Sequence, residues 1–385
     1  MTYQVLFEQP LEDQLVEVDQ IKRVKQALEL ATRDLEPSND YTLGVGIESI
    51  KETLQSFFKA IMIAIRNAFK NIYELYDKVL GFLGKLKFNI EVITKKLKQA
   101  SGSPKEQTMK VGSFWNQLTT IKNNQINACE DGSDVIDRLE ELDITSKAFF
   151  GDYSKIINTV GEKIASVYEK SSGKIIDKDA LNASIIEAVP KQANHHYSKI
   201  SSTSELYKGS RVYEATESLP GGLSIYLVNP LGFGNTLQTQ ALEASIDDTR
   251  LPEYWSKLQS VQYRVKPHEN KDKLNSKEFK IKTLEKSEIT EILKLCKKMI
   301  DEIETYRSGL ARQNRDQLDR LEKSGFRLID SKNSELNTSI YKSALKFSSA
   351  YTYWSTGIQK DLILINKSVI QSALMACEKA LVVYG

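Results

Sequence analysis

The longest regular pattern in the chain runs from residue 47 to residue 98 and predicts a single amphipathic α-helix. Its apolar side chains recur at spacings of three and four, which places them on one helix face, and charged side chains fall on the opposite face. Gly81 and Gly84 are the positions where we expect a kink, and turn residues at 101–104 end the helix. The apolar positions are Leu54, Phe58, Ile61, Ile65, Phe69, Ile72, Tyr76, Val79, Leu83, Leu86, Ile90, Ile93 and Leu97.

The rest of the chain predicts further helices on both sides of a strand-rich region. The predicted helices span residues 113–128, 133–142, 153–169 and 178–188, then a helix opened by Ser287, a charged helix through Lys323 and a last stretch at 338–383. Short segments of mostly alternating polar and apolar residues, separated by Gly and Pro, predict strands at 211–215, 223–228, 260–265 and 278–283. We therefore expect a mainly α fold with a small antiparallel β insertion (α+β), in which long amphipathic helices form a bundle.

These elements divide the chain into four predicted regions. Residues 1–48 form an acidic N-terminal arm, in which residues 16–35 fit a short helix. Residues 49–200 form a helical domain with the long basic helix, and residues 201–285 form a small β-rich subdomain. Residues 286–385 form C-terminal helices that pack on the helical domain. The chain has only 8 Pro in 385 residues, which agrees with long helices.

Charge separates the arm from the long helix. Residues 1–48 hold 4 Lys/Arg and 10 Asp/Glu, a net charge of −6. Residues 49–110 hold 12 Lys/Arg and 5 Asp/Glu, a net charge of +7. These opposed charges nearly cancel, so the whole-chain value of +2 hides the organisation.

The basic, aromatic-rich helix has two interpretations. Aromatic side chains at helical spacing usually form core, and Lys/Arg on the outer face are usually solvated. The alternative is a surface that binds a partner helix, a membrane surface or the phosphates of nucleic acid. The candidate phosphate-contacting or DNA-contacting residues are Lys59, Arg66, Lys70, Lys85, Lys95, Lys96 and Lys98.

The sequence offers no candidate catalytic residue or metal ligand and implies no cofactor. The pair His195-His196 lacks the further His or Cys that a zinc site needs. The segment 172–174 reads Ser-Gly-Lys but lacks the other positions of a phosphate-binding loop. No apolar run approaches the roughly 20 residues of a transmembrane helix. We therefore expect neither an enzyme nor a transmembrane segment.

An acidic arm, a break at residues 44–46 and a basic aromatic helix beginning at Ile47 follow one another in the chain. A Leu-Pro-Gly-Gly turn at 219–222 precedes a strand, and a Lys/Glu-rich helix follows Lys286. This layout resembles that of internal head proteins, which are virion structural proteins of large (jumbo) tailed bacteriophages. The resemblance implies a protein packaged with the genome inside the head, beside other virion proteins and in contact with packaged DNA. It also implies a stay in the host cytoplasm during assembly and ejection with the genome as a candidate step.

The resemblance further implies that a head maturation protease removes an N-terminal propeptide. Such proteases cut after Glu in a small-residue-x-Glu context, which occurs at Ala27-Leu28-Glu29 and at Gly46-Ile47-Glu48. We favour Glu48, because a cut there removes the arm's −6 and changes the net charge from +2 to +8. The same short pattern recurs at residues 241–243, so it is a weak signal by itself.

Two other functions remain open at this stage. An α-helical pore-forming or membrane-active protein would also combine long helices, an aromatic amphipathic element and a small β part. The spacing of Lys59, Arg66 and Lys70 argues against an inserting hairpin. A helical scaffold or adaptor of cellular origin is the third interpretation.

Overall fold

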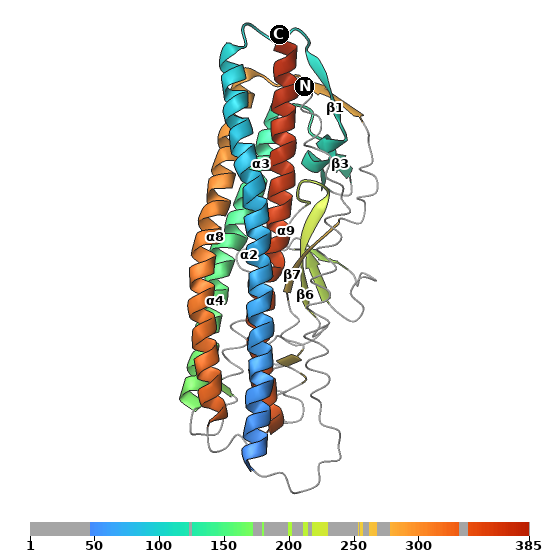
Figure 1. Ribbon diagram of the computed structural model, residues 1–385. Coiled ribbons are helices and arrows are strands. Elements are labelled where there is room, and N and C mark those ends of the chain that lie inside the picture. The colour runs from blue at the N-terminus through green and yellow to red at the C-terminus, as the bar shows by residue number, and fades with distance from the viewer. Residues whose placement is uncertain are drawn as a thin grey trace.

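Long helices lie side by side in an elongated bundle, and small β elements lie along one side of it (Figure 1). The predicted helix at 16–35 lies outside the described residues, as does the pair His195-His196. Of the predicted helix at 178–188, only residues 179–180 are described. The computed structural model describes residues 47–122, 125–171, 179–180, 199–201, 211–214, 218–229, 253, 255–256, 262–267, 278–330 and 338–384.

Helix α2 (Ile47–Gln99) confirms the predicted long helix and its apolar face. At 1.5 Å per residue, its 53 residues span about 80 Å. Every predicted apolar position is buried except Leu97, which is partly buried against the core. From Phe69 onward the spacing alternates strictly between three and four, the heptad period of coiled-coil packing. The helix continues through Gly81 and Gly84 without interruption.

Helices α8 (Lys286–Ile329) and α9 (Thr338–Tyr384) cover the apolar face of α2. The segments predicted as two helices after Ser287 form the single helix α8. Its N-cap is Glu285 and not Ser287, because Glu285 and Glu288 form a reciprocal capping box. Apolar residues of α9 are buried on most sides, as expected for a helix at the centre of a bundle.

Helix α3 (Gly132–Lys147), the π-helical turn η3 (Ala148–Tyr153) and helix α4 (Ser154–Ser171) follow one another without a break. They confirm the predicted helices at 133–142 and 153–169. They pack on α8 and α9 through polar as well as apolar contacts. Asn366 Nδ2 donates to Ser146 Oγ at 2.8 Å, and Gln359 Nε2 donates to Ser154 Oγ at 2.7 Å. These hydrogen bonds therefore fix the position of α3, η3 and α4 against α9.

The four-stranded antiparallel sheet confirms the predicted β insertion, but one of the predicted strands pairs outside this sheet. Its order is β4 (Lys199–Ser201), β5 (Arg211–Glu214), β6 (Leu223–Asn229) and β7 (Gln262–Pro267). The strand predicted at 278–283 forms as β8 (Glu278–Lys282) but pairs with β1 (Thr108–Gly112), which the sequence did not predict. The sheet packs on α9 through β7.

The prediction of an α-helix at 113–128 is wrong. This segment forms a 3-10 helix, η2 (Ser113–Leu118), followed by the hairpin of β2 (Thr120–Lys122) and β3 (Gln125–Asn127). The fully buried Trp115 donates from Nε1 to the carbonyl oxygen of Cys129 at 2.9 Å. Tertiary burial of these side chains overrides the apolar spacing that favoured a helix.

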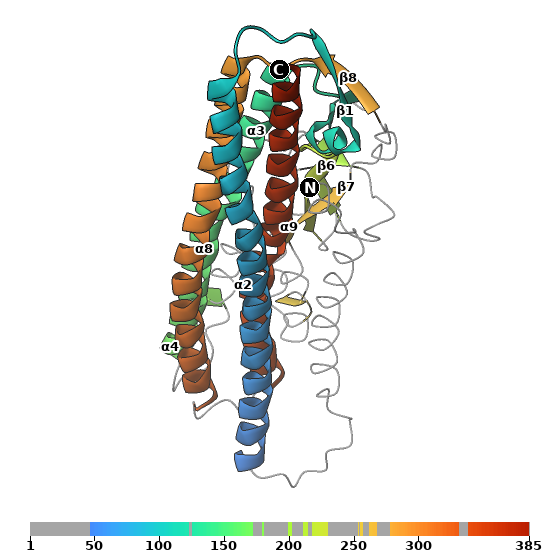
Figure 2. The same ribbon diagram turned by 45° about the horizontal axis from the view of Figure 1, so that its top comes forward.

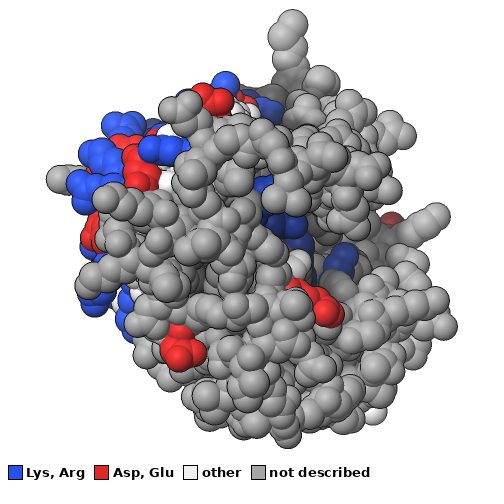
Figure 3. Space-filling view, turned by 90° about the horizontal axis from the view of Figure 1, so that it is seen from below, with Lys and Arg blue, Asp and Glu red and all other residues white. Residues whose placement is uncertain are grey.

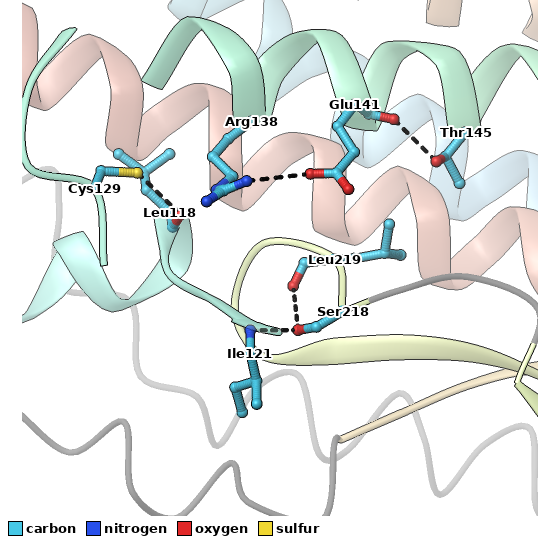
Figure 4. Close-up of polar contacts among 8 residues, drawn as sticks. All are labelled: Leu118, Ile121, Cys129, Arg138, Glu141, Thr145, Ser218 and Leu219. Carbon is cyan, nitrogen blue, oxygen red and sulfur yellow. Dashed lines mark hydrogen bonds and ion pairs between the residues drawn. The ribbon is translucent and has the colours of Figure 1, made fainter. Parts of the chain in front are cut away.

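Short polar contacts join β2 to the turn before β6, and join η2 to the segment just before helix α3 (Figure 4). Ile121 N donates to Ser218 Oγ at 2.8 Å, and Cys129 Sγ donates to the carbonyl oxygen of Leu118 at 3.2 Å. The predicted glycine turn lies here, and the positive φ angles of Gly221 and Gly222 let both N–H groups reach the carbonyl oxygen of Thr119. The turn before β6 is thus bonded to residues 119–121, while β7 packs on α9.

Glycine at position 325 of α8 leaves room for the ring of Phe58 from α2. A Cβ placed there would lie 2.3 Å from Cζ of Phe58, whose ring is fully buried and stacks edge-on to Phe326. We expect Gly325→Ala to lower the free energy of unfolding by about 1–3 kcal/mol, because overpacking forces the ring or the helix to move. Urea denaturation followed by circular dichroism measures the change.

Gly309→Ala is the matched control in the same helix, because nothing lies within 4 Å of an added Cβ there. Replacing a helical glycine by alanine ordinarily adds about 1 kcal/mol of stability. The two variants should therefore shift the midpoint of urea denaturation in opposite directions. Shifts of the same sign would contradict this packing.

A buried carboxylate clamps α3 to α8. Asp143 Oδ2 accepts hydrogen bonds from Lys147 Nζ at 2.8 Å and from Lys298 Nζ at 2.9 Å. Burial alone would raise the pKa of Asp143, but these hydrogen bonds outweigh it and hold the pKa below its ordinary value. Burial and the nearby Asp143 raise the pKa of the adjacent Glu302.

Because the pKa of Asp143 is lower in the folded state, its ionised carboxylate stabilises the fold at pH values above the unfolded-state pKa of about 3.9. This stabilisation is lost as the pH falls through the folded-state pKa. We expect Asp143→Asn to lower the free energy of unfolding by about 1–3 kcal/mol at pH 7, because a charge-assisted contact is lost. The difference from wild type should shrink below pH about 4. Glu302→Gln is the control that keeps Asp143. A difference that stays constant from pH 7 to pH 3 in denaturant titrations would contradict the assignment.

Candidate functional site

The candidate phosphate-contacting residues lie along the outer face of α2. All seven are exposed, as the sequence pattern predicted. Lys70 is 72% exposed, and its one ion pair among the described residues, with Glu74 one turn on, spans 3.8 Å. Such an exposed pair contributes little, so the ammonium of Lys70 stays accessible. Lys59 and Lys85 form no ion pair with any residue that the structure describes.

Arg66 differs from the other candidates because α8 binds it. Its Nη2 contacts Asp319 Oδ1 at 3.1 Å and also Glu322, and hydrogen bonds to Glu322 and Asp319 raise its pKa. Lys87, on the same edge of α2, contacts both Asp301 and Glu304 at 2.7 Å. These cations lie at the α2–α8 boundary and pair with carboxylates of α8.

The interhelical ion pairs follow one register. Lys51 contacts Asp330 at 2.8 Å, Arg66 contacts Asp319, Asp77 contacts Arg307, and Lys87 contacts Asp301. Partner numbers fall along α8 as residue numbers rise along α2, so the two helices run antiparallel. Part of the positive charge of α2 is therefore neutralised inside the molecule.

Lys95, Lys96 and Lys98 lie at the C-terminal tip of α2, which is the most basic part of its outer face. Each is exposed, and none forms an ion pair among the described residues. Cations in the last turn also stabilise a helix through its dipole, so part of their presence is structural. Lys286 Nζ donates to the carbonyl oxygen of Ala100 at 2.7 Å, which joins this tip to the start of α8.

Described side chains of both charges are visible from the end of the bundle opposite this tip. Figure 3, which views the molecule from below, shows basic and acidic side chains next to each other along one edge. An alternating surface of this kind attracts polyanions less than a group of like charges does.

The aromatic side chains of α2 are core residues, with one exception. Phe57, Phe58, Phe69 and Tyr76 are buried, which supports the interpretation of the aromatic stripe as core. Phe88 is 64% exposed and lies on the outer face. The helix therefore presents its charges, and not its aromatic stripe, to the surroundings.

The described residues contain no group of three or more His, Cys, Asp or Glu that could hold a metal ion. All three cysteines are buried as free thiols, and burial raises the pKa of Cys129 to about 12. A thiol of this kind is protonated at neutral pH and does not act as a nucleophile. Among the described helices none has the length and apolarity needed to cross a membrane.

The two candidate processing sites lie at and before the start of α2. Glu48 lies in the first turn of α2, which begins at Ile47. Glu29 lies outside the described residues. Among the side chains of α2 that the structure describes, which begin at Lys51, the first buried one is Leu54.

The described residues form an elongated bundle of long helices with small β elements along one side and exposed lysines on the outer face of α2. Residues 13–379 match the family model of phiKZ-like phage internal head proteins, and the chain belongs to this family. Its place is therefore the interior of the phage head, beside other virion proteins. No curated protein and no solved structure matches the chain. The family match confirms the resemblance to internal head proteins that the sequence showed.

The sequence pattern did not single out the lysines of β1 and β8, because β1 was not predicted and the pairing of β8 was wrong. Alternation of Met109 and Val111 with polar residues is the signal that could have found β1. With only five residues, β1 gives too short a pattern to be distinguished in the sequence from the neighbouring predicted helices.

The partners of Arg66 allow a test of its structural role. We expect Arg66→Ala to lower the free energy of unfolding by about 0.5–1 kcal/mol at low salt, because the guanidinium is 42% exposed and solvent screens its ion pairs. The loss should shrink as salt rises to about 1 M. Lys59→Ala is the control and should change stability by less than about 0.5 kcal/mol. Equal losses in both variants would show that the α8 carboxylates do not hold Arg66.

Proposed function

We propose that this protein is a non-enzymatic internal head component that packs against the genome and loses its acidic N-terminal arm after Glu48. The observation that carries the proposal is the junction at Glu48. There the charge of the chain changes sign, directly before the packed part of α2.

A cut after Glu48 would leave the described core intact. It removes only the first two residues of α2, whereas the first buried side chain among those described is Leu54. The first interhelical ion pair, between Lys51 and Asp330, would also remain. A protease needs an extended substrate, and the first turn of a helix unwinds at low cost, since its N–H groups lack partners within the helix.

The charge of the arm supplies a reason for its removal. The arm repels DNA while it is attached, and its loss raises the net charge of the chain from +2 to +8. A cut after Glu29 would remove six acidic and three basic residues and so only half of the negative net charge. Glu48 is therefore the site we favour.

The protein would contact DNA through phosphates and not through bases. Lysines supply point charges without a fixed geometry for base edges, which suits non-specific binding. We assign this role to the exposed lysines of α2, namely Lys59, Lys70, Lys85, Lys95, Lys96 and Lys98. Arg66 is less suited, because α8 already binds it.

Ejection with the genome belongs to the same proposal, since a protein bound to DNA by screened charges can leave with it. The pore-forming alternative is not supported, because α2 buries its apolar face within the bundle and the chain belongs to an internal head family. We do not propose it.

Mass spectrometry of purified virions tests the processing step. We expect the mature protein to begin at Ser49, because the protease recognises Gly46-Ile47-Glu48. Glu48→Gln should abolish that new N-terminus and leave the arm in the particle, whereas Glu29→Gln should not. Mature heads in which wild-type protein keeps residues 1–48, or begins at Leu30, would refute the site.

A further inference from the structure

Two lysines face each other on the exposed side of the β1–β8 ribbon. Lys110 of β1 is the direct cross-strand partner of Lys280 of β8, and both side chains are exposed. Residues that face each other in an antiparallel pair have Cβ atoms about 5 Å apart, and like charges in such a pair are destabilising. Neither lysine forms an ion pair with any residue that the structure describes.

The fold does not require lysine at these positions. The inner side of the ribbon holds it on the bundle, because Met109, Val111 and Ile281 are buried there. The outer side faces solvent, where a pair of opposite charges or of threonines would stabilise the ribbon better. The unfavourable pair therefore indicates a ligand that compensates it.

More positive charge lies close to this pair. Lys282 follows Lys280 on the same side of β8, opposite Thr108, and its ion pair with Glu285 is exposed and 3.5 Å long. The acidic neighbours are Glu278 at the other end of β8, opposite Gly112, and Glu106 just before β1. Lys110 and Lys280 thus lie in the middle of the ribbon, with Lys282 and the carboxylates toward its ends.

The ribbon and the basic tip of α2 lie at the same end of the molecule. Figures 1 and 2 show the end of α2, the end of α9 and the β1–β8 ribbon together there. The hydrogen bond from Lys286 to Ala100 links the chain just after β8 to the chain just after α2. Five exposed lysines from two distant parts of the sequence therefore belong to this end, namely Lys95, Lys96, Lys98, Lys110 and Lys280.

We propose that the exposed side of the β1–β8 ribbon is a phosphate-binding site for double-stranded DNA, with Lys110 and Lys280 on either side of one backbone phosphate. This proposal rests on the proposed packing against the genome and adds the site that makes the contact. A phosphate between the two ammonium groups relieves their repulsion. The tip of α2 binds neighbouring phosphates of the same duplex. Binding is independent of sequence and falls steeply with salt.

The test measures the affinity of the full-length chain, and of the processed chain that begins at Ser49, for a labelled duplex of arbitrary sequence over a range of salt concentrations. We expect Lys110→Thr/Lys280→Thr to weaken binding about tenfold at 0.1 M salt and to reduce the salt slope by about 2, since each phosphate contact contributes about 0.9. Lys170→Ala/Lys323→Ala is the matched control. It removes two exposed lysines from the C-terminal parts of α4 and α8 and should change the affinity less than about twofold.

A single charge reversal separates binding from folding. Lys280→Glu places a carboxylate opposite Lys110, which should leave the melting temperature unchanged or higher. The same variant should weaken DNA binding at least as much as the double threonine variant.

The outcomes distinguish the two proposals. If neither the full-length wild-type chain nor the chain that begins at Ser49 binds duplex DNA, the proposed packing against the genome fails. If the wild-type chain binds and the ribbon variants bind equally well, the ribbon site is wrong while DNA contact stands. A ribbon variant that loses binding and stability together would overturn the assignment, because the pair would then be structural.

Discussion

Burial of one face of α2 along its whole length is the constraint on which the rest of the structure depends. Twelve of its thirteen stripe positions are buried, and each fully buried Leu, Ile or Phe contributes about 1.5–3 kcal/mol. The exposed ion pairs along the α2–α8 boundary contribute about 0–1 kcal/mol each. Apolar burial therefore holds the helices together, and the ion pairs set their antiparallel register. A face of about 80 Å needs partners of similar length, which α8 and α9 provide.

The same packing sorts the positive charge of α2 into two classes. Cations at the edge of the stripe, such as Arg66 and Lys87, meet carboxylates of α8 and become part of the bundle. Cations farther from the edge, such as Lys85 and Lys96, stay exposed. A net charge of +7 counted over residues 49–110 thus overstates the charge available to a partner. Family membership gives the protein its place inside the head, and the exposed cations are the part of the surface suited to DNA.

The long helices could be read from the sequence because their signal is local and repeated. Thirteen apolar positions at helical spacing predicted α2, and Glu285 was missed as the cap of α8 only because Ser287 is the more common capping residue type. The segment at 113–128 failed because Trp115 and Leu118 are spaced as in a helix but are buried by a 3-10 turn and a hairpin. Strand β8 was found, whereas its partner was not, since pairing depends on contacts between residues far apart in the chain.

The sequence by itself determined the helical class, the apolar stripe of α2 and the change of charge at Glu48, because each is a property of neighbouring residues. Only the tertiary structure decided which cations are neutralised and which strands pair. It brought Lys110 opposite Lys280, which lie 170 positions apart in the chain. Such a juxtaposition leaves no local pattern, because it arises when the bundle brings β1 and β8 together at one end.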